Sequence, residues 1–181
     1  MHEEPDDAPI PRTGEASVRE FREHLARRLA DAHSGIGVAN RLGLMIGGQR
    51  WLVALEDAGE IAAVPPVTPV PLTQPWFRGL AGVRGNLVTI IDLSMFGGGE
   101  PTPVDREGRI VSFGPTLGCN AALLATRMLG LRSMDGMRPA AGNADAPAWV
   151  GPGFADEDGN EWRELALRAL ARDERFLHAG L

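Results

Sequence analysis

The sequence predicts an all-β fold from Arg41 onward, and three observations lead to this prediction. Short extended runs recur at a spacing of about 8 to 12 residues, which is typical of small sandwiches and barrels. Dipeptides that favour tight hairpin turns separate several of these runs, namely Gly47-Gly48, Gly85-Asn86 and Asp158-Gly159. The intervening segments lack the helical pattern that a parallel α/β sheet would require. The 181 residues suffice for two small barrels, built from about eight to ten strands.

The predicted strands pair as hairpins around those turns. Residues 114–118 read Gly-Pro-Thr-Leu-Gly and connect two further runs, and residues 140–147 are predicted to be a loop. In chain order, the extended runs are Leu42–Ile46, Trp51–Leu55, Ala81–Arg84, Leu87–Ile91, Arg109–Phe113 and Cys119–Ala125, followed by a hairpin between Phe154 and Trp162.

The segment Val64–Gly79 interrupts this pattern because it holds five of the fourteen prolines. Proline cannot donate a hydrogen bond to a strand ladder, so the segment is predicted to be an extended connection or an edge strand. Near its end, a Thr-x-Pro pattern at Thr73 and a later glycine predict a single helical turn. We expect the two aromatic residues on this turn, Trp76 and Phe77, to be core side chains.

Both ends of the chain are predicted to differ from the β-rich region. Residues 1–16 are predicted to be a disordered acidic tail, and residues 17–40 a helix and linker. That helix could pack on its own domain or bind a partner, and both interpretations remain open. At the other end, Leu167–Leu177 favours a C-terminal helix. The N-terminal helix rests on a capping box, Ser17 with Glu20, and on apolar residues at helical spacing, Val18, Phe21, Leu25 and Leu29.

Composition and charge exclude several classes of function. The formal net charge is −6, with 18 basic and 24 acidic residues, so the chain lacks the basic surface that nucleic acid binding requires. No apolar run is long enough to span a membrane, and the acidic start does not resemble a signal peptide. The single cysteine suits a reducing compartment. We therefore expect a cytoplasmic protein that binds no nucleic acid and does not insert into a membrane.

The residues that could carry chemistry do not form a recognisable catalytic or cofactor site. Cys119 lies in an apolar run with no histidine near it in sequence, so an inert buried thiol is expected. The four histidines are not spaced as metal ligands, and the triple glycine at residues 97–99 lacks the Lys-Ser/Thr of a phosphate-binding loop. We expect no catalytic residues, no metal and no cofactor. An enzyme that uses Cys119 or the acidic residues remains an alternative.

One segment is far more specific than any of these. From Gly79 to Leu93 the chain reads GLAGVRGNLVTIIDL, with Glu60-Ile61 upstream and a single glycine, Gly130, downstream at fitting distances. This run resembles the signature of CheW-type chemotaxis coupling proteins, and the resemblance extends over about residues 41–178. The long N-terminal extension and the spacing from Trp149 onward are most similar to the version of the family associated with twitching motility by type IV pili.

The resemblance implies a fold and a set of partners. It implies two SH3-like five-stranded β-barrels in residues 41–181, flanked by an N-terminal and a C-terminal helix. It also implies a non-catalytic adaptor that couples the cytoplasmic tip of a methyl-accepting chemoreceptor to the regulatory domain of a CheA-type histidine kinase. The pathway implied is type IV pilus twitching motility. A scaffold of a flagellar or other chemosensory array is the alternative, and so is a module of this fold with different partners.

Three residues carry the implied partner contacts. Arg84 matches the receptor-contact arginine of the family, while Glu60 and Ile61 match positions on the kinase-facing surface. Arg84 precedes the predicted turn at Gly85, where a side chain is normally exposed, and its guanidinium suits a carboxylate or carbonyl target. Alternation alone does not show whether Ile61 faces the core. The chain departs from the family pattern at Gly82, Val83, Thr89 and Thr126.

Overall fold

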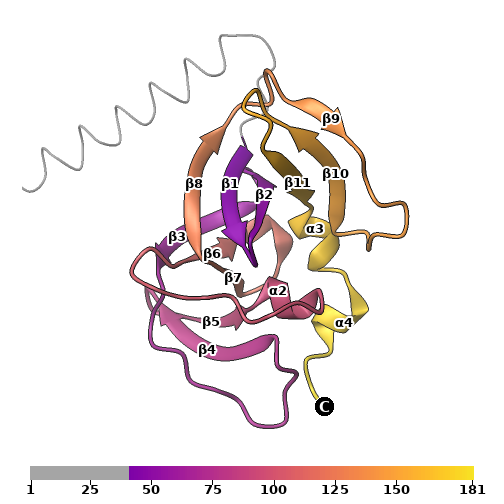
Figure 1. The fold of residues 1–181 in the computed structure, drawn as a ribbon. Helices are drawn as coiled ribbons and strands as arrows, with labels where there is room; N and C mark the ends of the chain where they lie inside the picture. Colours follow the sequence, from indigo (N-terminus) through magenta and orange to yellow (C-terminus); the bar gives the residue numbers. More distant parts are fainter. Residues whose placement is uncertain (1–40) are drawn as a thin grey trace, which may run out of the picture. The chain divides into compact units, whose positions relative to one another are not determined.

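The computed structural model describes residues 41–181, which form two mixed β-sheets with short helices beside them (Figure 1). The predicted acidic tail, residues 1–16, and the predicted helix and linker, residues 17–40, lie outside the described residues. Within residues 41–181 the prediction of a mostly β fold is confirmed.

The strands divide into a six-stranded and a five-stranded sheet. The six-stranded sheet has the order β8-β1-β2-β11-β10-β9, and the five-stranded sheet has the order β3-β6-β7-β5-β4. The elements are β1 (Arg41–Ile46), β2 (Gln49–Ala54), β3 (Ala58–Ala63), β4 (Phe77–Val83), β5 (Asn86–Ile91), α2 (Leu93–Phe96), β6 (Arg109–Phe113), η1 (Pro115–Leu117), β7 (Ala121–Ala125), β8 (Arg127–Arg132), β9 (Arg138–Ala140), β10 (Val150–Ala155), β11 (Glu161–Leu165), α3 (Leu167–Leu170) and α4 (Glu174–Leu177).

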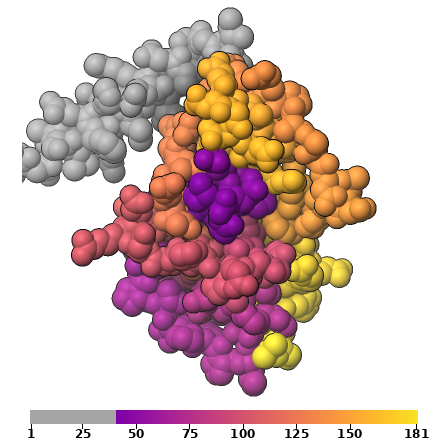
Figure 2. Space-filling model, in the orientation of Figure 1, coloured from indigo at the N-terminus to yellow at the C-terminus, as the bar shows by residue number. Residues whose placement is uncertain are grey.

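The chain begins the six-stranded sheet, builds the whole five-stranded sheet, and then returns to complete the first. β2 and β11 pair in parallel, as do β5 and β7, and the remaining neighbours are antiparallel. In Figure 2 the indigo residues of the first strands lie against the orange residues of the later strands. The first and last strands therefore depend on each other to form one sheet.

Two of the predicted hairpin turns lie where the sequence placed them. Gly47 and Gly48 have φ angles of 58° and 75°, which is the left-handed conformation that a two-residue hairpin turn requires at both positions. Gly159 has a φ angle of 80° in the turn between β10 and β11. These turns are confirmed because glycine adopts positive φ at little energetic cost.

The turn between β4 and β5 lies one residue earlier than predicted. Val83 pairs with Asn86, so Arg84 and Gly85 are the two turn residues and Asn86 already belongs to β5. Both turn residues have positive φ angles, 47° for Arg84 and 82° for Gly85. The predicted turn at Gly85-Asn86 was wrong because pairing of Asn86 extends the ladder and leaves Arg84 to occupy the left-handed position.

The proline-rich segment joins the two edges of the five-stranded sheet. Beyond β3, Thr68 forms an isolated bridge with Leu80 of β4 through reciprocal backbone hydrogen bonds of 2.8 and 2.9 Å. Gly79 adopts a φ angle of 135° at this crossing, and a Cβ there would collide with the carbonyl oxygen of Thr68. The sheet thus curls so that the chain leaving one edge strand, β3, reaches the other, β4.

The helical turn predicted around Trp76 and Phe77 does not form. The amide of Phe77 donates to the carbonyl oxygen of Gln74 at 3.0 Å in a simple turn, and Phe77 begins β4. The carbonyl oxygen of Trp76 accepts from the amide of Asp92 at 2.8 Å, so pairing with the chain that follows β5 extends to this point. Trp76 is buried, as predicted, and Phe77 is half-buried.

The predicted C-terminal helix is split into α3 and α4. Asp173 lies between them in an extended conformation, and its carboxylate accepts from the amide of Arg175 at 2.9 Å, which caps α4. A continuous helix was the wrong prediction, because the break turns Phe176 into the core and leaves Leu177 61% exposed.

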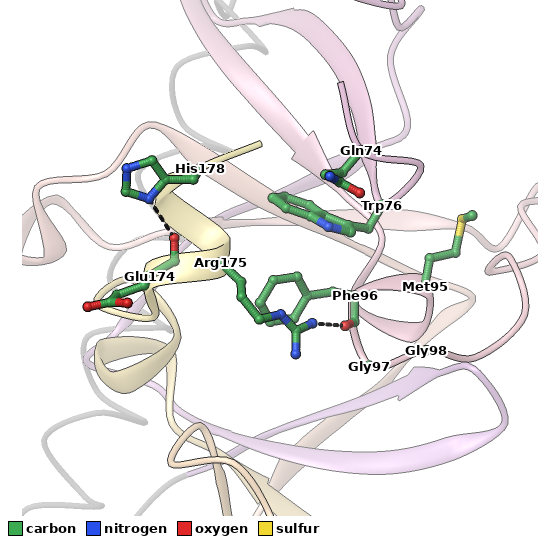
Figure 3. A pocket seen from close by; sticks show the side chains of 9 residues that line it. All are labelled: Gln74, Trp76, Met95, Phe96, Gly97, Gly98, Glu174, Arg175 and His178. Carbon is green, nitrogen blue, oxygen red and sulfur yellow. Dashed lines mark hydrogen bonds between the residues drawn. The ribbon is translucent and has the colours of Figure 1, made fainter. Parts of the chain in front are cut away.

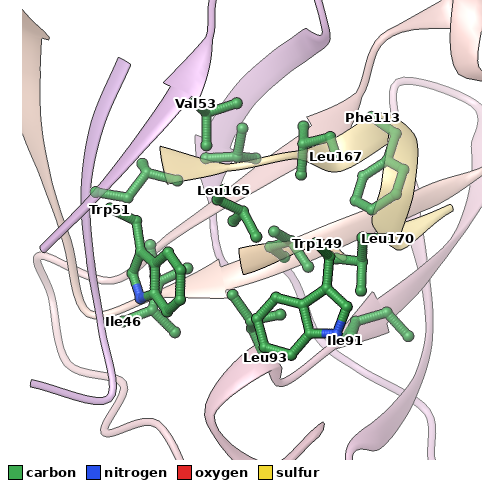
Figure 4. Close-up of a cluster of buried hydrophobic side chains, with 14 of the residues drawn as sticks. Ile46, Trp51, Val53, Ile91, Leu93, Phe113, Trp149, Leu165, Leu167 and Leu170 are labelled. Carbon is green, nitrogen blue, oxygen red and sulfur yellow. The ribbon is translucent and has the colours of Figure 1, made fainter. Parts of the chain in front are cut away.

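The larger of two hydrophobic clusters lies where the two sheets and the helices meet (Figure 4). A second, smaller cluster lies on the other face of the five-stranded sheet, so adjacent residues of its central strands, such as Ile90 and Ile91, are both buried. Burial on both faces explains why these strands are continuous apolar runs. The first cluster includes Leu44, Trp51, Val53, Ile91, Leu93, Phe96, Val111, Phe113, Leu123, Trp149, Leu165, Leu167, Leu170 and Phe176.

Asp92 is the buried polar residue that fixes the start of α2. Its carboxylate accepts from the amide of Met95 at 3.4 Å and from the amide and hydroxyl of Thr102 at 2.8 and 2.7 Å. Each contact gives a hydrogen-bond acceptor to a donor that burial would otherwise leave unpaired. Asp92 is therefore a structural capping residue, and it ties Thr102 to the start of α2.

Asp156 has the same function in the turn between β10 and β11. Its carboxylate accepts from the indole N–H of the buried Trp162 at 2.9 Å and from both the amide and side chain of Asn160. These hydrogen bonds, that from Trp162 first, hold the pKa of Asp156 at about 2, below its ordinary value near 3.8. The charged form therefore supports the folded state.

Replacing Phe176 should test whether α4 is part of the core between the sheets. We expect Phe176→Ala to lower the free energy of unfolding by about 3 kcal/mol, the usual cost of truncating a buried phenylalanine. Urea unfolding measures this change. The matched control is Leu177→Ala, which alters an exposed neighbour and should change stability by about 0.5 kcal/mol or less. Equal effects of the two variants would contradict the burial of Phe176.

Acid titration of Asp156→Ala should show a stability difference that depends on pH. Because folding lowers the pKa of Asp156, its charge stabilises the protein above about pH 4, and this contribution is lost as the pH falls toward about 2. The gap in melting temperature between wild type and variant should therefore narrow from pH 4 to pH 2. A gap of constant size across that range would show that the charge is irrelevant.

Candidate partner-binding site

An ion pair brings together two of the three residues that the sequence singled out. The Nε atom of Arg84 lies 2.6 Å from Oε1 of Glu60. The Arg84 side chain is 80% exposed and the Glu60 side chain 28% exposed, so the pair lies at the surface. The structure thus places on one patch two residues that the family resemblance assigns to different partners.

The local fold explains why Arg84 is presented to solvent. It occupies the first position of the two-residue turn between β4 and β5, where the side chain leaves the sheet altogether. The strands on either side are anchored by Val83 and Val88, which belong to the smaller core cluster. The guanidinium therefore extends from a short turn whose flanking strands are anchored in the core, and Glu60 contacts it at Nε.

Ile61 lies beside Glu60 on β3, and the structure resolves the question of its orientation. Its side chain is 41% exposed, and it belongs to an edge strand whose only partner in the sheet is β6. The core-packing interpretation of Ile61 is therefore wrong. An exposed isoleucine next to an ion pair is a common composition for a protein-binding surface, in which apolar contacts provide affinity and charges provide specificity.

Leu87 is a surface residue that the sequence analysis missed. It follows the turn by two positions and its side chain is exposed, whereas Val88 beside it is buried. The run Leu87–Ile91 is apolar almost throughout, so its alternation is masked and the exposed face cannot be read from it. Thr89, the one polar residue of the run, was the available signal, since residues two apart share a face of a strand.

A cavity of about 380 Å³ opens next to Glu60 at one end of the five-stranded sheet. Val83, Val88 and Phe113 supply apolar walls, and Cys119 also lines it. Burial raises the pKa of the Cys119 thiol, which disfavours the reactive thiolate. Cys119 is therefore suited to packing and poorly suited to nucleophilic attack.

Neither a metal site nor a membrane span is found in the described part of the chain. Among residues 41–181, no group of three or more His, Cys, Asp and Glu side chains could hold a metal ion. No helix in that part is long and apolar enough to cross a bilayer.

Comparisons with known proteins show what this chain is similar to. The model of the CheW-like domain family matches residues 41–174. Protein PilI of Pseudomonas aeruginosa is 33% identical over 70 residues, which are 39% of this chain and 39% of PilI, so the match spans well under half of that relative. The scaffolding protein TtCheW of Thermoanaerobacter tengcongensis has a similar fold, with a TM-score of 0.60 at 16% identity, over 71% of this chain and 89% of TtCheW.

The family match covers far more than half of the chain and includes both sheets, α2 and α3. The fold of TtCheW agrees with it independently of sequence, because at 16% identity only the architecture is compared. The chain therefore belongs to the family of proteins with a CheW-like domain.

Proposed function

We propose that this protein is a non-catalytic cytoplasmic adaptor in a chemosensory signal transduction pathway. It couples the cytoplasmic tip of a methyl-accepting chemoreceptor to the regulatory domain of a CheA-type histidine kinase. The observation that carries the proposal is the exposed ion pair between Arg84 and Glu60, two residues that the sequence resemblance matches to partner contacts of the family.

The arrangement of this patch supports a role in binding. Arg84 contacts the receptor, and Glu60 and Ile61 contact the kinase. Arginine is enriched at interface hot spots because its planar guanidinium forms several directional hydrogen bonds at once. Since Arg84 already pairs with Glu60, a partner that reaches either side chain must replace or extend this ion pair. Binding at Arg84 therefore affects Glu60 directly.

The pathway proposed is the control of twitching motility by type IV pili. The 33% identity with Protein PilI over 70 residues supports it. Affinity purification of the full chain from native cells, with identification of the kinase that accompanies it, tests this assignment. Recovery of a kinase that serves flagellar rotation would contradict it.

Reversing the charge of Arg84 should uncouple signalling without unfolding the protein. In Arg84→Glu a carboxylate would face Glu60 across the same short gap, and the partner would lose its arginine contact. Loss of an interface arginine commonly costs about 2 kcal/mol of binding, or about a thirtyfold loss of affinity. The measurement is receptor-stimulated kinase activity in a reconstituted complex, together with thermal melting of the variant.

Arg138→Glu is the matched control for this experiment, since Arg138 is exposed on β9 in the other sheet. We expect it to retain receptor-stimulated activity. Near-normal activity of a folded Arg84→Glu variant would contradict the role of Arg84. A melting temperature lowered by about 10 °C would instead show that Arg84 is structural, because that shift is larger than a surface substitution produces.

Deleting the gene should abolish twitching and leave other movement intact if the pilus assignment is correct. Complementation with wild type should restore twitching on agar, whereas complementation with Arg84→Glu should not, because the kinase would no longer respond to its receptor. Comparable protein levels of the two forms are checked by immunoblot. Loss of swimming with normal twitching would point to a flagellar array.

A further inference from the structure

A second cavity lies far from the patch around Arg84 and Glu60. It has a volume of about 600 Å³, and Trp76, Phe96 and Arg175 line it together with residues of α2 and α4 (Figure 3). Trp76 directly precedes β4 and Arg84 directly follows it, so the length of this strand separates the two sites. At about 3.3 Å per residue, that separation is about 25 Å.

Arg175 is held in a fixed position at this cavity. Its Nη2 atom donates to the carbonyl oxygen of Phe96 at 2.5 Å, and its guanidinium carbon lies 4.5 Å from the centroid of the Phe96 ring. Phe96 is itself buried and packs edge-on against Trp76 and Phe176. Two contacts to a core residue thus pre-organise an exposed guanidinium, which lowers the entropy cost of binding a ligand.

Within residues 41–181, Arg175 forms no ion pair with a carboxylate, although acidic residues lie beside it in sequence. Among the described residues, Glu174 is the one carboxylate that lines the cavity, and Figure 3 shows its oxygens pointing away from Arg175. Arg175 and Gly97 also line a further cavity of about 530 Å³, which extends to Trp51 and Arg163. Arg175 therefore lies at the junction of two recesses with aromatic walls.

We propose that the Arg175 cavity is a second docking site, for a segment of a partner protein that carries a carboxylate beside an apolar side chain. The carboxylate pairs with the free donors of Arg175, and the apolar side chain enters the recess lined by Trp76, Met95 and Phe96. The complementarity argues for this occupant, because the fixed guanidinium, which has no acidic partner within residues 41–181, lies over the ring of Phe96.

The inference rests on the proposed adaptor function and adds to the contacts at Glu60 and Ile61 a second site for the kinase, away from the receptor contact at Arg84. A separation of about 25 Å along β4 lets two partners bind at once, one at Arg84 and one at Arg175. Both sites are anchored on the same sheet and the same core, so the geometry between them is set by the fold.

Binding of the full chain to the purified receptor tip and to the purified kinase tests the proposal. We expect Arg175→Glu to lower the affinity for the kinase at least tenfold and leave receptor binding unchanged, while Arg84→Glu weakens receptor binding. Gly97→Asp is a second variant that retains Arg175. Gly97 has φ −78° and ψ 2°, and a Cβ there meets nothing closer than 3.5 Å. The carboxylate that this substitution introduces should pair with the Arg175 guanidinium and weaken binding of the same partner.

Arg172→Glu is the control for charge, because Arg172 is exposed between α3 and α4. If Arg175→Glu or Gly97→Asp binds both partners with wild-type affinity, the inference is overturned. It is also overturned if only Arg175→Glu loses affinity and that variant has a lowered melting temperature. A further outcome is that sodium benzoate quenches the tryptophan fluorescence while neither variant changes the affinity for either partner. That result would assign the cavity to a small anion and would also overturn the inference. If wild type binds neither partner, the proposed adaptor function itself fails.

Discussion

The packing of four aromatic side chains between the two sheets is the constraint on which the rest of this structure depends. Phe176 stacks against Trp76 at 6.1 Å and against Phe113 at 5.6 Å between ring centroids, and Phe96 meets Trp76 edge-on at 5.0 Å. These residues come from α4, the start of β4, β6 and α2, so parts of the chain up to 100 residues apart converge on one point. Large aromatic side chains contribute most of the buried area in such a cluster. The cluster therefore fixes how the C-terminal helices lie against the five-stranded sheet.

That packing also decides which surfaces the protein can offer. β4 begins at the aromatic cluster and ends at the turn that carries Arg84, so its position is set by burial at one end while its other end is presented to solvent. β3 is held in the five-stranded sheet by its pairing with β6. The ion pair between Glu60 and Arg84 then links β3, one edge strand of this sheet, to the turn that follows β4, the other edge strand. A rigid core with exposed charged residues on its rim suits a protein that holds partners at defined positions.

The fold could be predicted from the sequence wherever the signal was local. Glycine pairs identified hairpin turns, and continuous apolar runs identified β5, β6 and β7, because backbone conformation and burial leave a direct imprint on residue type. β3, β8 and β9 were not singled out, since short edge strands with glycine, proline and arginine do not differ in composition from loops. The turn at Arg84-Gly85 and the break at Asp173 were misplaced by local reasoning, because strand register and core packing outweighed residue preference there.

By itself, the sequence determined that this is a mostly β protein. Its most specific motif, Gly79–Leu93, indicated the CheW-like family, and the family resemblance singled out Glu60, Ile61 and Arg84 as candidate partner contacts. The sequence could not show that Glu60 and Arg84 form an ion pair or that Ile61 is exposed. Those properties were decided only by the tertiary structure, since they depend on which strands are neighbours and on which face each strand buries. Pairing partners are set by contacts between distant segments, and side-chain alternation in an apolar run is compatible with either face. The fixed position of Arg175 over Phe96 has the same origin, because 79 residues separate them in the sequence.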